Sequence, residues 1–270
     1  IILTIVSLLA LWPFFKKGFF ESHDGEWMVI RFSAFHQTFT AGQFPVRFTD
    51  RLNNNYGYPV FNFLYPLPFY YAEIFKLLGF GFVDSIKITF ITSTLASTIL
   101  MFWALSQRFS KESSFVAAIF YLYVPYRFVD LYVRGSIGEN FAFAILPLVL
   151  GSIFKIDDGK NYYKPILSLS IGALLLSHNV IAAIFLPIFI VISYIDSKKN
   201  FTQNILFIIM GILISAFFTV PALYDLHFVK LSQIKVSEII DHMSSMKNLL
   251  IPSWGYGSTP QGLNAFSPQL

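Results

Sequence analysis

The segment "FFESHDGEWMVIRF", which begins at Phe19, gathers side chains that exchange protons. Glu21, His23, Asp24 and Glu26 occupy four of its first eight positions, in a chain of which only 13% is charged. Carboxylates and imidazoles are common general acids and bases, and carboxylates also hold hard divalent cations. Asp24 is therefore the strongest candidate for a base, and the adjoining His23 can tune or share its proton.

Apolar runs separate such polar segments and predict the helices that position them. The chain has 270 residues, is 55% hydrophobic and contains 32 Phe, which is too apolar for a soluble surface. An all-α polytopic membrane protein with about seven spans is predicted. The predicted spans are 1–15, 86–107, 115–130, 140–155, 164–178, 180–195 and 204–226. The absence of Cys excludes disulfides and zinc–thiolate sites, and a net charge of +4 indicates no nucleic-acid partner.

Basic residues in the short loops orient the predicted bundle. The loops 106–114, 155–164 and 196–200 all carry Lys or Arg, and they share one side if residues 65–82 do not cross the membrane. Short basic loops mark the cytoplasmic side of a membrane. We therefore expect a multi-pass protein of the plasma membrane whose polar candidates lie on the outer face.

Residues 65–82 are expected to lie along the interface. Their helical part is short for a crossing, and it carries Glu73 and Lys76 three positions apart on one helical face. The expected organisation is one transmembrane domain over 1–270, incomplete at both ends, with a first outer loop over 16–85 and an outer loop over 227–270.

The first outer loop carries the motifs that indicate a family. Asp24 begins an amphipathic surface helix that ends near Gly42, and "GQFPVRF" and "NYGYPVFNFLYPLPFYY" follow as ordered turns. This order resembles the first outer loop of the GT-C superfamily of membrane glycosyltransferases. "VPYRFVDLYVRGSIGENFAF" and "TVPALYDL" resemble, more closely, a bacterial membrane family labelled as related to 6-pyruvoyl-tetrahydropterin synthase and grouped with the GT-C enzymes. No pterin-synthase feature, such as a close His cluster for zinc, is present in the sequence.

The GT-C resemblance implies a GT-C-like fold and sugar transfer from a polyprenyl-phosphate donor, with the catalytic acid at Asp24. Such transfer needs a base that takes the acceptor hydroxyl proton while the phosphate leaves from the opposite face. The alternative is that Asp24 only caps the surface helix, a contact that stabilises by about 1 kcal/mol. Both interpretations can hold together.

Glu139 and Asp130 lie in the second predicted outer turn. An acid there can pair with Asp24 to bind a divalent cation, Mg or Mn, that neutralises the leaving phosphate, as the GT-C resemblance implies. The alternative for Glu139 is a helix start, because "SIGEN" is a good N-terminus and acids stabilise that end. The two interpretations of Glu139 have equal weight.

Four arginines at predicted outer positions are candidate ligands for the lipid phosphate, because a guanidinium offers a fork to phosphate oxygens. They are Arg47, Arg51, Arg127 and Arg134. Arg134 is preferred, since it precedes Gly135 and a helix start that also favours anions. The alternative for each is ordinary headgroup snorkelling.

Further polar residues stand at predicted outer ends. His178 in "LLLSHNVIAAIF" lies between two apolar runs and must face water or the site, although a tight outer turn explains it equally well. Asp225 ends the "TVPALYDL" motif. His36, about 120° around the helix from Asp24, is expected to be structural.

The predicted function is sugar transfer from a polyprenyl-phosphate sugar to a glycan, lipid or protein acceptor of the cell envelope. Membrane lipids are the expected surroundings, and nucleic acid is not a partner. One alternative is a transporter or flippase of lipid-linked sugars, which predicts broken or charged helices at mid-depth. A second is a non-catalytic envelope-assembly protein with the same fold.

Overall fold

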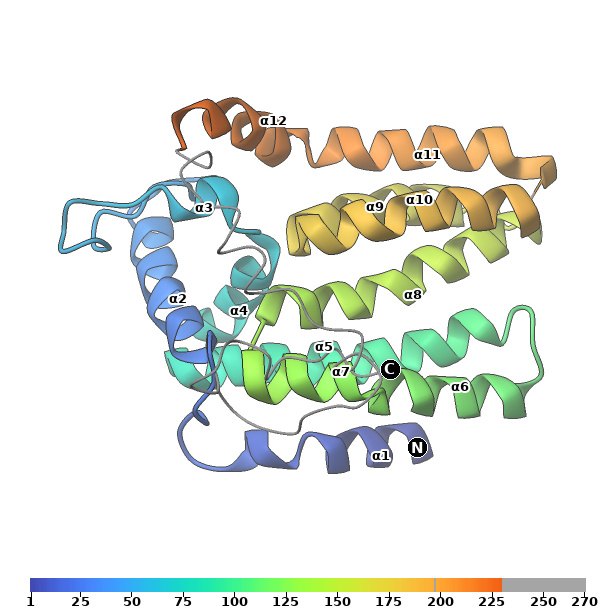
Figure 1. The fold of residues 1–270 in the computed structure, drawn as a ribbon, viewed down its shortest axis with the longest axis horizontal. Coiled ribbons are helices and arrows are strands. Elements are labelled where there is room, and N and C mark those ends of the chain that lie inside the picture. The colour runs from blue at the N-terminus through green and yellow to red at the C-terminus, as the bar shows by residue number, and fades with distance from the viewer. Residues whose placement is uncertain (197, 230–270) are drawn as a thin grey trace, which may run out of the picture.

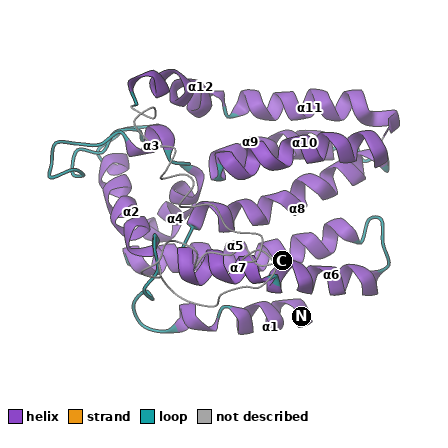
Figure 2. Cartoon of the chain, viewed as in Figure 1, coloured by secondary structure: helices purple, strands orange, loops and turns teal. Residues whose placement is uncertain are grey.

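The computed structural model describes residues 1–196 and 198–229, and its architecture is helical throughout that part. Figure 2 shows helices and loops and no strand over the described residues. One isolated antiparallel bridge, between Thr49 and Tyr58, closes the loop that precedes α3. The predicted all-α class is confirmed, while the expected outer loop 227–270 lies outside the described residues beyond 229.

The helices of the bundle run roughly parallel to the longest axis of the molecule (Figure 1). They are α1 (Ile2–Ala10), α5 (Phe82–Leu105), α6 (Lys111–Tyr123), α8 (Ile137–Asp157), α9 (Tyr163–Ser177), α10 (Asn179–Asp196) and α11 (Phe201–Ile214). The remaining elements are η1 (Trp12–Phe15), α2 (Gly25–Thr40), α3 (Val60–Phe63), α4 (Leu67–Leu77), α7 (Pro125–Phe128), the π-helix η2 (Val129–Arg134), η3 (Lys198–Asn200), α12 (Ala216–Asp225) and η4 (Leu226–Phe228).

Three described helices, α5, α8 and α10, are long and apolar enough to cross a membrane. The number rises to five if two bent pairs each form one span: residues 111–134, bent by 44°, and residues 198–228, bent by 64°. A membrane protein is therefore confirmed. The finer prediction of seven spans stays a prediction, because α1 has 9 residues and α9 has 15.

Helix α8 is the centre of the bundle. Within its most apolar window 83% of the residues are buried, against 17% for α10. Gly151 lets α8 approach α5 closely, because a Cβ there would meet the indole ring of Trp103. Helix α10 instead exposes Ile184, Ile188 and Val191, as expected of a helix that faces lipid.

The end of the bundle that carries α2, α3 and α4 is called the Asp24 end, and it lies at the left of Figure 1. Helix α4 has 11 residues and a length of about 16 Å, roughly half of a hydrocarbon core. It is too short to cross alone. Glu73 does not lie on an exposed polar face with Lys76, because its buried carboxylate lies 2.7 Å from His36 Nδ1. A buried charge needs such a partner, and this gives His36 the structural role expected of it.

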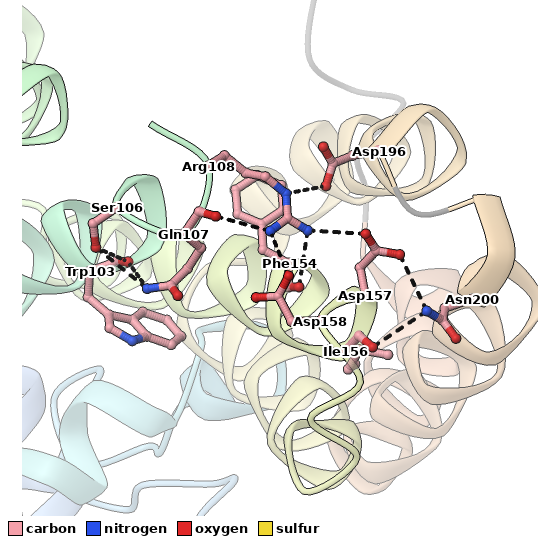
Figure 3. Close-up of polar contacts among 10 residues, drawn as sticks. All are labelled: Trp103, Ser106, Gln107, Arg108, Phe154, Ile156, Asp157, Asp158, Asp196 and Asn200. Atoms are coloured by element: carbon pink, nitrogen blue, oxygen red, sulfur yellow. Dashed lines mark hydrogen bonds and ion pairs between the residues drawn. The ribbon is translucent and has the colours of Figure 1, made fainter. Parts of the chain in front are cut away.

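The opposite end, called the Arg108 end, joins three helix connections through one guanidinium (Figure 3). Arg108 lies between the carboxylates of Asp157, Asp158 and Asp196, with nitrogen–oxygen distances of 3.3, 3.1 and 2.9 Å. Its Nη2 also donates to the Phe154 carbonyl at 3.1 Å. The loops predicted to share one side therefore meet at one end of the bundle.

Candidate functional site

Two turns that are far apart in the sequence are joined by backbone hydrogen bonds at the Asp24 end. The amide of His23 donates to the Val133 carbonyl at 2.9 Å, and the amide of Asp24 donates to the Arg134 carbonyl at 2.8 Å. These bonds connect the start of α2 to the end of η2. The first outer loop and the 130–139 turn therefore form one site, which places Asp24 beside the candidate phosphate ligand Arg134.

Asp24 occupies the N-cap position of α2, but its carboxylate makes no capping hydrogen bond. Ser22 caps the helix instead, because its Oγ accepts from the Gly25 amide at 3.1 Å. The side chain of Asp24 therefore does not act as the hydrogen-bonding cap of the alternative interpretation, since a cap uses the side-chain oxygen. Asp24 is half-buried and His23 is exposed, and the catalytic role of both stays a prediction.

The carboxylate of Glu139 is the centre of a buried ionic cluster. Tyr126 donates its hydroxyl to Glu139 Oε2 at 2.7 Å, and Arg134 Nη1 donates to Glu139 Oε1. Arg134 Nη1 also donates to the Tyr126 hydroxyl at 3.0 Å, which closes a ring of three side chains. His178 Nε2 lies 3.8 Å from Glu139 Oε1. Both interpretations of Glu139 are compatible with this geometry, because it is in the first turn of α8 and in contact with the candidate ligand.

Asp130 adds a second carboxylate to the cluster and is fully buried. Its Oδ1 lies 3.7 Å from Arg134 Nη1, and its charge interacts with that of Glu139. Neither oxygen of Asp130 accepts a geometrically acceptable hydrogen bond from the described residues. Arg134 therefore faces two carboxylates and is held by both, with 31% of its own side chain exposed.

Tyr65 is buried against the first turn of α8 and against His178. A Cβ added at Gly138 would lie 2.2 Å from Tyr65 Cζ, which shows how closely the phenol packs on that turn. Burial is the main reason why the pKa of Tyr65 rises to about 12, so the phenol stays protonated and can donate.

His178 joins the cluster from the break between α9 and α10. Its Nδ1 accepts a hydrogen bond from the Ile181 amide at 3.2 Å, so the proton of the neutral ring is on Nε2, which faces Glu139. Its ring lies 5.2 Å from the ring of Tyr65, centroid to centroid. Burial lowers the pKa of His178. His178 therefore caps the start of α10 with its side chain and also lies next to Glu139.

Arg127 is not placed to bind a ligand at the boundary. Its guanidinium is buried between the rings of Tyr121 and Phe143, at 5.1 and 4.6 Å from their centroids. One of its nitrogens, Nη2, donates to Ser97 Oγ at 3.0 Å. These contacts support packing between helices rather than phosphate binding.

The other candidate residues form separate contacts. Arg47 donates to the Asn62 side chain at 3.1 Å and to the Phe217 carbonyl at 2.5 Å, and the Asn62 amide donates to Asp225. This joins the first outer loop to α12. Arg51 donates to Ser33 Oγ at 2.6 Å, on the surface of α2. Over the described chain, no hydrogen bond or ion pair connects these residues directly to the Glu139 cluster.

The predicted divalent-cation site is not formed by these side chains. Among the described residues, no group of three or more His, Asp and Glu side chains is arranged to hold a metal ion. Both oxygens of Glu139 are already engaged, by Arg134 and by Tyr126. Glu139 is therefore not available to Mg or Mn in this arrangement, and a divalent cation at this end stays a prediction.

Sequence reasoning missed Tyr65, Tyr126 and Ser136. The tyrosines lie in the quoted motifs "NYGYPVFNFLYPLPFYY" and "VPYRFVDLYVRGSIGENFAF", but aromatic residues are abundant in this chain and carried no separate signal. Neither a Tyr two residues before a helix nor a Ser before Ile137 indicates a functional site in a sequence. Their position near the buried acids is known only from the structure.

The fold and the site define a helical membrane protein with a buried ionic cluster at one end of its bundle. The chain belongs to the family described as 6-pyruvoyl-tetrahydropterin synthase related domain, membrane protein, whose model matches residues 61–258. The family predicted from the sequence motifs is thereby confirmed. No curated protein and no solved structure matches the chain. Asp24 precedes the matched range, and the Glu139 cluster lies within it.

Proposed function

We propose that this chain is a GT-C-type glycosyltransferase that moves a sugar from a polyprenyl-phosphate donor to a hydroxyl of an envelope glycan, lipid or protein. The reaction takes place at the Asp24 end, which we assign to the outer face of the plasma membrane. The observation that carries the proposal is the Asp24 carboxylate: it occupies a cap position without capping, and it is joined through the backbone to Arg134.

In the proposed reaction an oxygen of Asp24 takes the proton of the acceptor hydroxyl. The acceptor oxygen forms a bond to C1 of the sugar, and the bond between C1 and the phosphate oxygen breaks. The electron pair of that bond leaves with polyprenyl phosphate. Arg134 is the group in this cluster that stabilises the leaving phosphate, because its guanidinium is partly exposed and can form charge-assisted hydrogen bonds.

Glu139 and Asp130 are positioning residues in this proposal. They hold the guanidinium of Arg134 from the buried side and leave its other face to the ligand. A preorganised donor stabilises developing charge without reorganisation, which is the usual source of a large part of enzymatic rate enhancement. Tyr126 and His178 complete the partners of Glu139.

The test is to incubate the purified protein with a panel of polyprenyl-phosphate sugars and an envelope extract, and to measure the release of polyprenyl phosphate. Release that depends on Asp24 supports the proposal. Movement of a labelled lipid-linked sugar between the leaflets of a vesicle, without release, would indicate the transporter alternative instead.

Substitution of Asp24 by Asn and of Ser22 by Ala tests the assignment of roles. Asp24→Asn removes the base and keeps the shape, so we expect an unchanged melting temperature and a transfer rate lower by about 10²–10⁴-fold. Ser22→Ala removes the cap and should lower the free energy of unfolding by about 1 kcal/mol with chemistry retained. Thermal melts and initial rates measure both. Normal transfer by a folded Asp24→Asn protein would remove Asp24 from the mechanism.

A further inference from the structure

A cavity of about 320 Å³ lies between α2 and the loop that precedes α3. It is lined by Trp27, Ile30, Arg31, Leu52, Asn53 and Tyr58. Trp27 lies three residues after Asp24, a rise of about 4.5 Å along α2. The cavity therefore begins about one helical turn from the uncommitted carboxylate.

The lining combines flat aromatic faces with polar groups that lack protein partners. Trp27 and Tyr58 are both exposed. Over the described chain, neither the Arg31 guanidinium nor the Asn53 amide forms a hydrogen bond or ion pair with another residue, in contrast to the engaged Arg47 and Arg51. Sugar rings require such a surface, because their C–H faces stack on aromatic rings and their hydroxyls need donors and acceptors. Arg31 is the one charged residue of the lining, which favours a sugar with an anionic substituent.

The loop side of the cavity is held in an unusual backbone conformation. Asn53, Asn54 and Asn55 have φ angles of +56°, +54° and +66°, a region that Asn tolerates better than other residues with a Cβ. The turn is closed by hydrogen bonds of 3.0 Å in both directions between Thr49 and Tyr58. Backbone conformations of this kind persist only where the surrounding structure determines them, and they cluster at ligand sites.

We propose that this cavity binds an anionic carbohydrate, with the ring stacked on Trp27 and the acidic substituent on Arg31. Because three of its residues lie on the helix that Asp24 precedes, we assign it to the acceptor side of the reaction, a role that rests on the proposed function. Binding itself does not depend on transfer, so it can be measured without any donor.

The experiment is equilibrium binding of a trisaccharide of galacturonic acid to the full chain in lipid nanodiscs, followed by calorimetry, with maltotriose as the neutral comparison. We expect saturable binding of the acidic probe and weaker binding of the neutral one. Trp27→Ala and Arg31→Gln should each lower the affinity for the acidic probe at least about tenfold, as removal of a central contact residue does. The matched control is Trp12→Ala, because Trp12 is 62% exposed and Trp27 is 56% exposed, and only Trp27 lines the cavity.

Three results would overturn the proposal: no binding of the acidic probe, equal binding of the two probes, or equal loss of affinity in the Trp12→Ala control. A fourth is quenching by brominated lipids of the Trp27 contribution to the emission, obtained as the difference between the wild type and Trp27→Phe, since lipid would then occupy the cavity. Carbohydrate binding without any transfer would keep the cavity assignment and reject the proposed function, so the two failures are distinguishable.

Discussion

Substitution of Gly135 by Ala should separate the two turns that form the site. Gly135 has a φ of +67°, and an added Cβ would lie 2.7 Å from Ser22 Oγ and 3.0 Å from the Gly25 nitrogen. The 2.7 Å distance forces the Ser22 side chain, which caps α2, to move, and the 3.0 Å distance requires the Gly25 backbone to shift by a few tenths of an ångström. We therefore expect the turn that carries Asp24 to be displaced from the turn that carries Arg134.

The magnitude has two parts, and a matched glycine separates them. Ala in the left-handed region costs roughly 1–2 kcal/mol at any position. Gly159 has a φ of +79° with no atom within 4 Å of an added Cβ, so Gly159→Ala should show this part alone. Gly135→Ala adds an overpacking term of typically about 1–3 kcal/mol. Displacement of a catalytic group by about 1 Å lowers rates about 10²-fold, so transfer should fall much further than stability explains.

Thermal melting in detergent and initial rates of polyprenyl-phosphate release measure the two effects. We expect the Gly159→Ala protein to be slightly destabilised and fully active, and the Gly135→Ala protein to be more destabilised and nearly inactive at a temperature where it is folded. Equal stability and equal activity of the two variants would show that the contact between the turns does not position Asp24.

Three further predictions concern topology, pH and the far end of the bundle. Because the chain has no Cys, single Cys residues at Glu21 and Lys160 should be labelled by an impermeant reagent from opposite sides of the membrane, Glu21 from outside. Burial lowers the pKa of His178, so the unfolded state binds more protons as pH falls through about 6.5; the wild-type melting temperature should decline there, and the decline should be smaller in His178→Asn. Arg108→Ala should lower the free energy of unfolding by about 1–2 kcal/mol by removing three partly exposed ion pairs, an effect that high salt reduces and that leaves donor binding unchanged.

The coarse architecture could be predicted because apolar periodicity and loop charge act at the scale of whole helices. The basic loops predicted to share one side do meet at the Arg108 end (Figure 3). The predicted boundaries differ where a helix is interrupted: the predicted span 115–130 is broken at Val124, where the helix gives way to α7 and η2. A Pro at 125 indicates a break, but composition alone does not give the 44° bend.

The candidate residues lie together as expected, and their pairings were predicted less well. Asp24, Asp130, Arg134, Glu139 and His178 gather at the Asp24 end because each stands at or near that end of a helix, while their role in a site stays a prediction. Which carboxylate pairs with which arginine depends on the directions of the side chains, and a single sequence does not define those directions. The burial of Arg127 between two rings is the clearest case, since its position at a predicted boundary suggested a surface role.

Both ends of the bundle hold an arginine among several carboxylates, and the two clusters differ in burial and in hydrogen bonding. The acids around Arg108 are all partly exposed, and each has an oxygen within 3.3 Å of a guanidinium nitrogen, which is sufficient to join three helix ends. The acids around Arg134 are buried, and the oxygens of Asp130 accept no hydrogen bond from the described residues, an arrangement that is expensive for stability alone. Asp24 lies on a turn that backbone hydrogen bonds join to the turn of Arg134, and its side chain makes no capping hydrogen bond. A buried acid without a hydrogen-bond donor beside a partly exposed guanidinium is the feature on which we base the proposal that the Asp24 end binds an anionic ligand, and the acids around Arg108 lack that feature over the described chain.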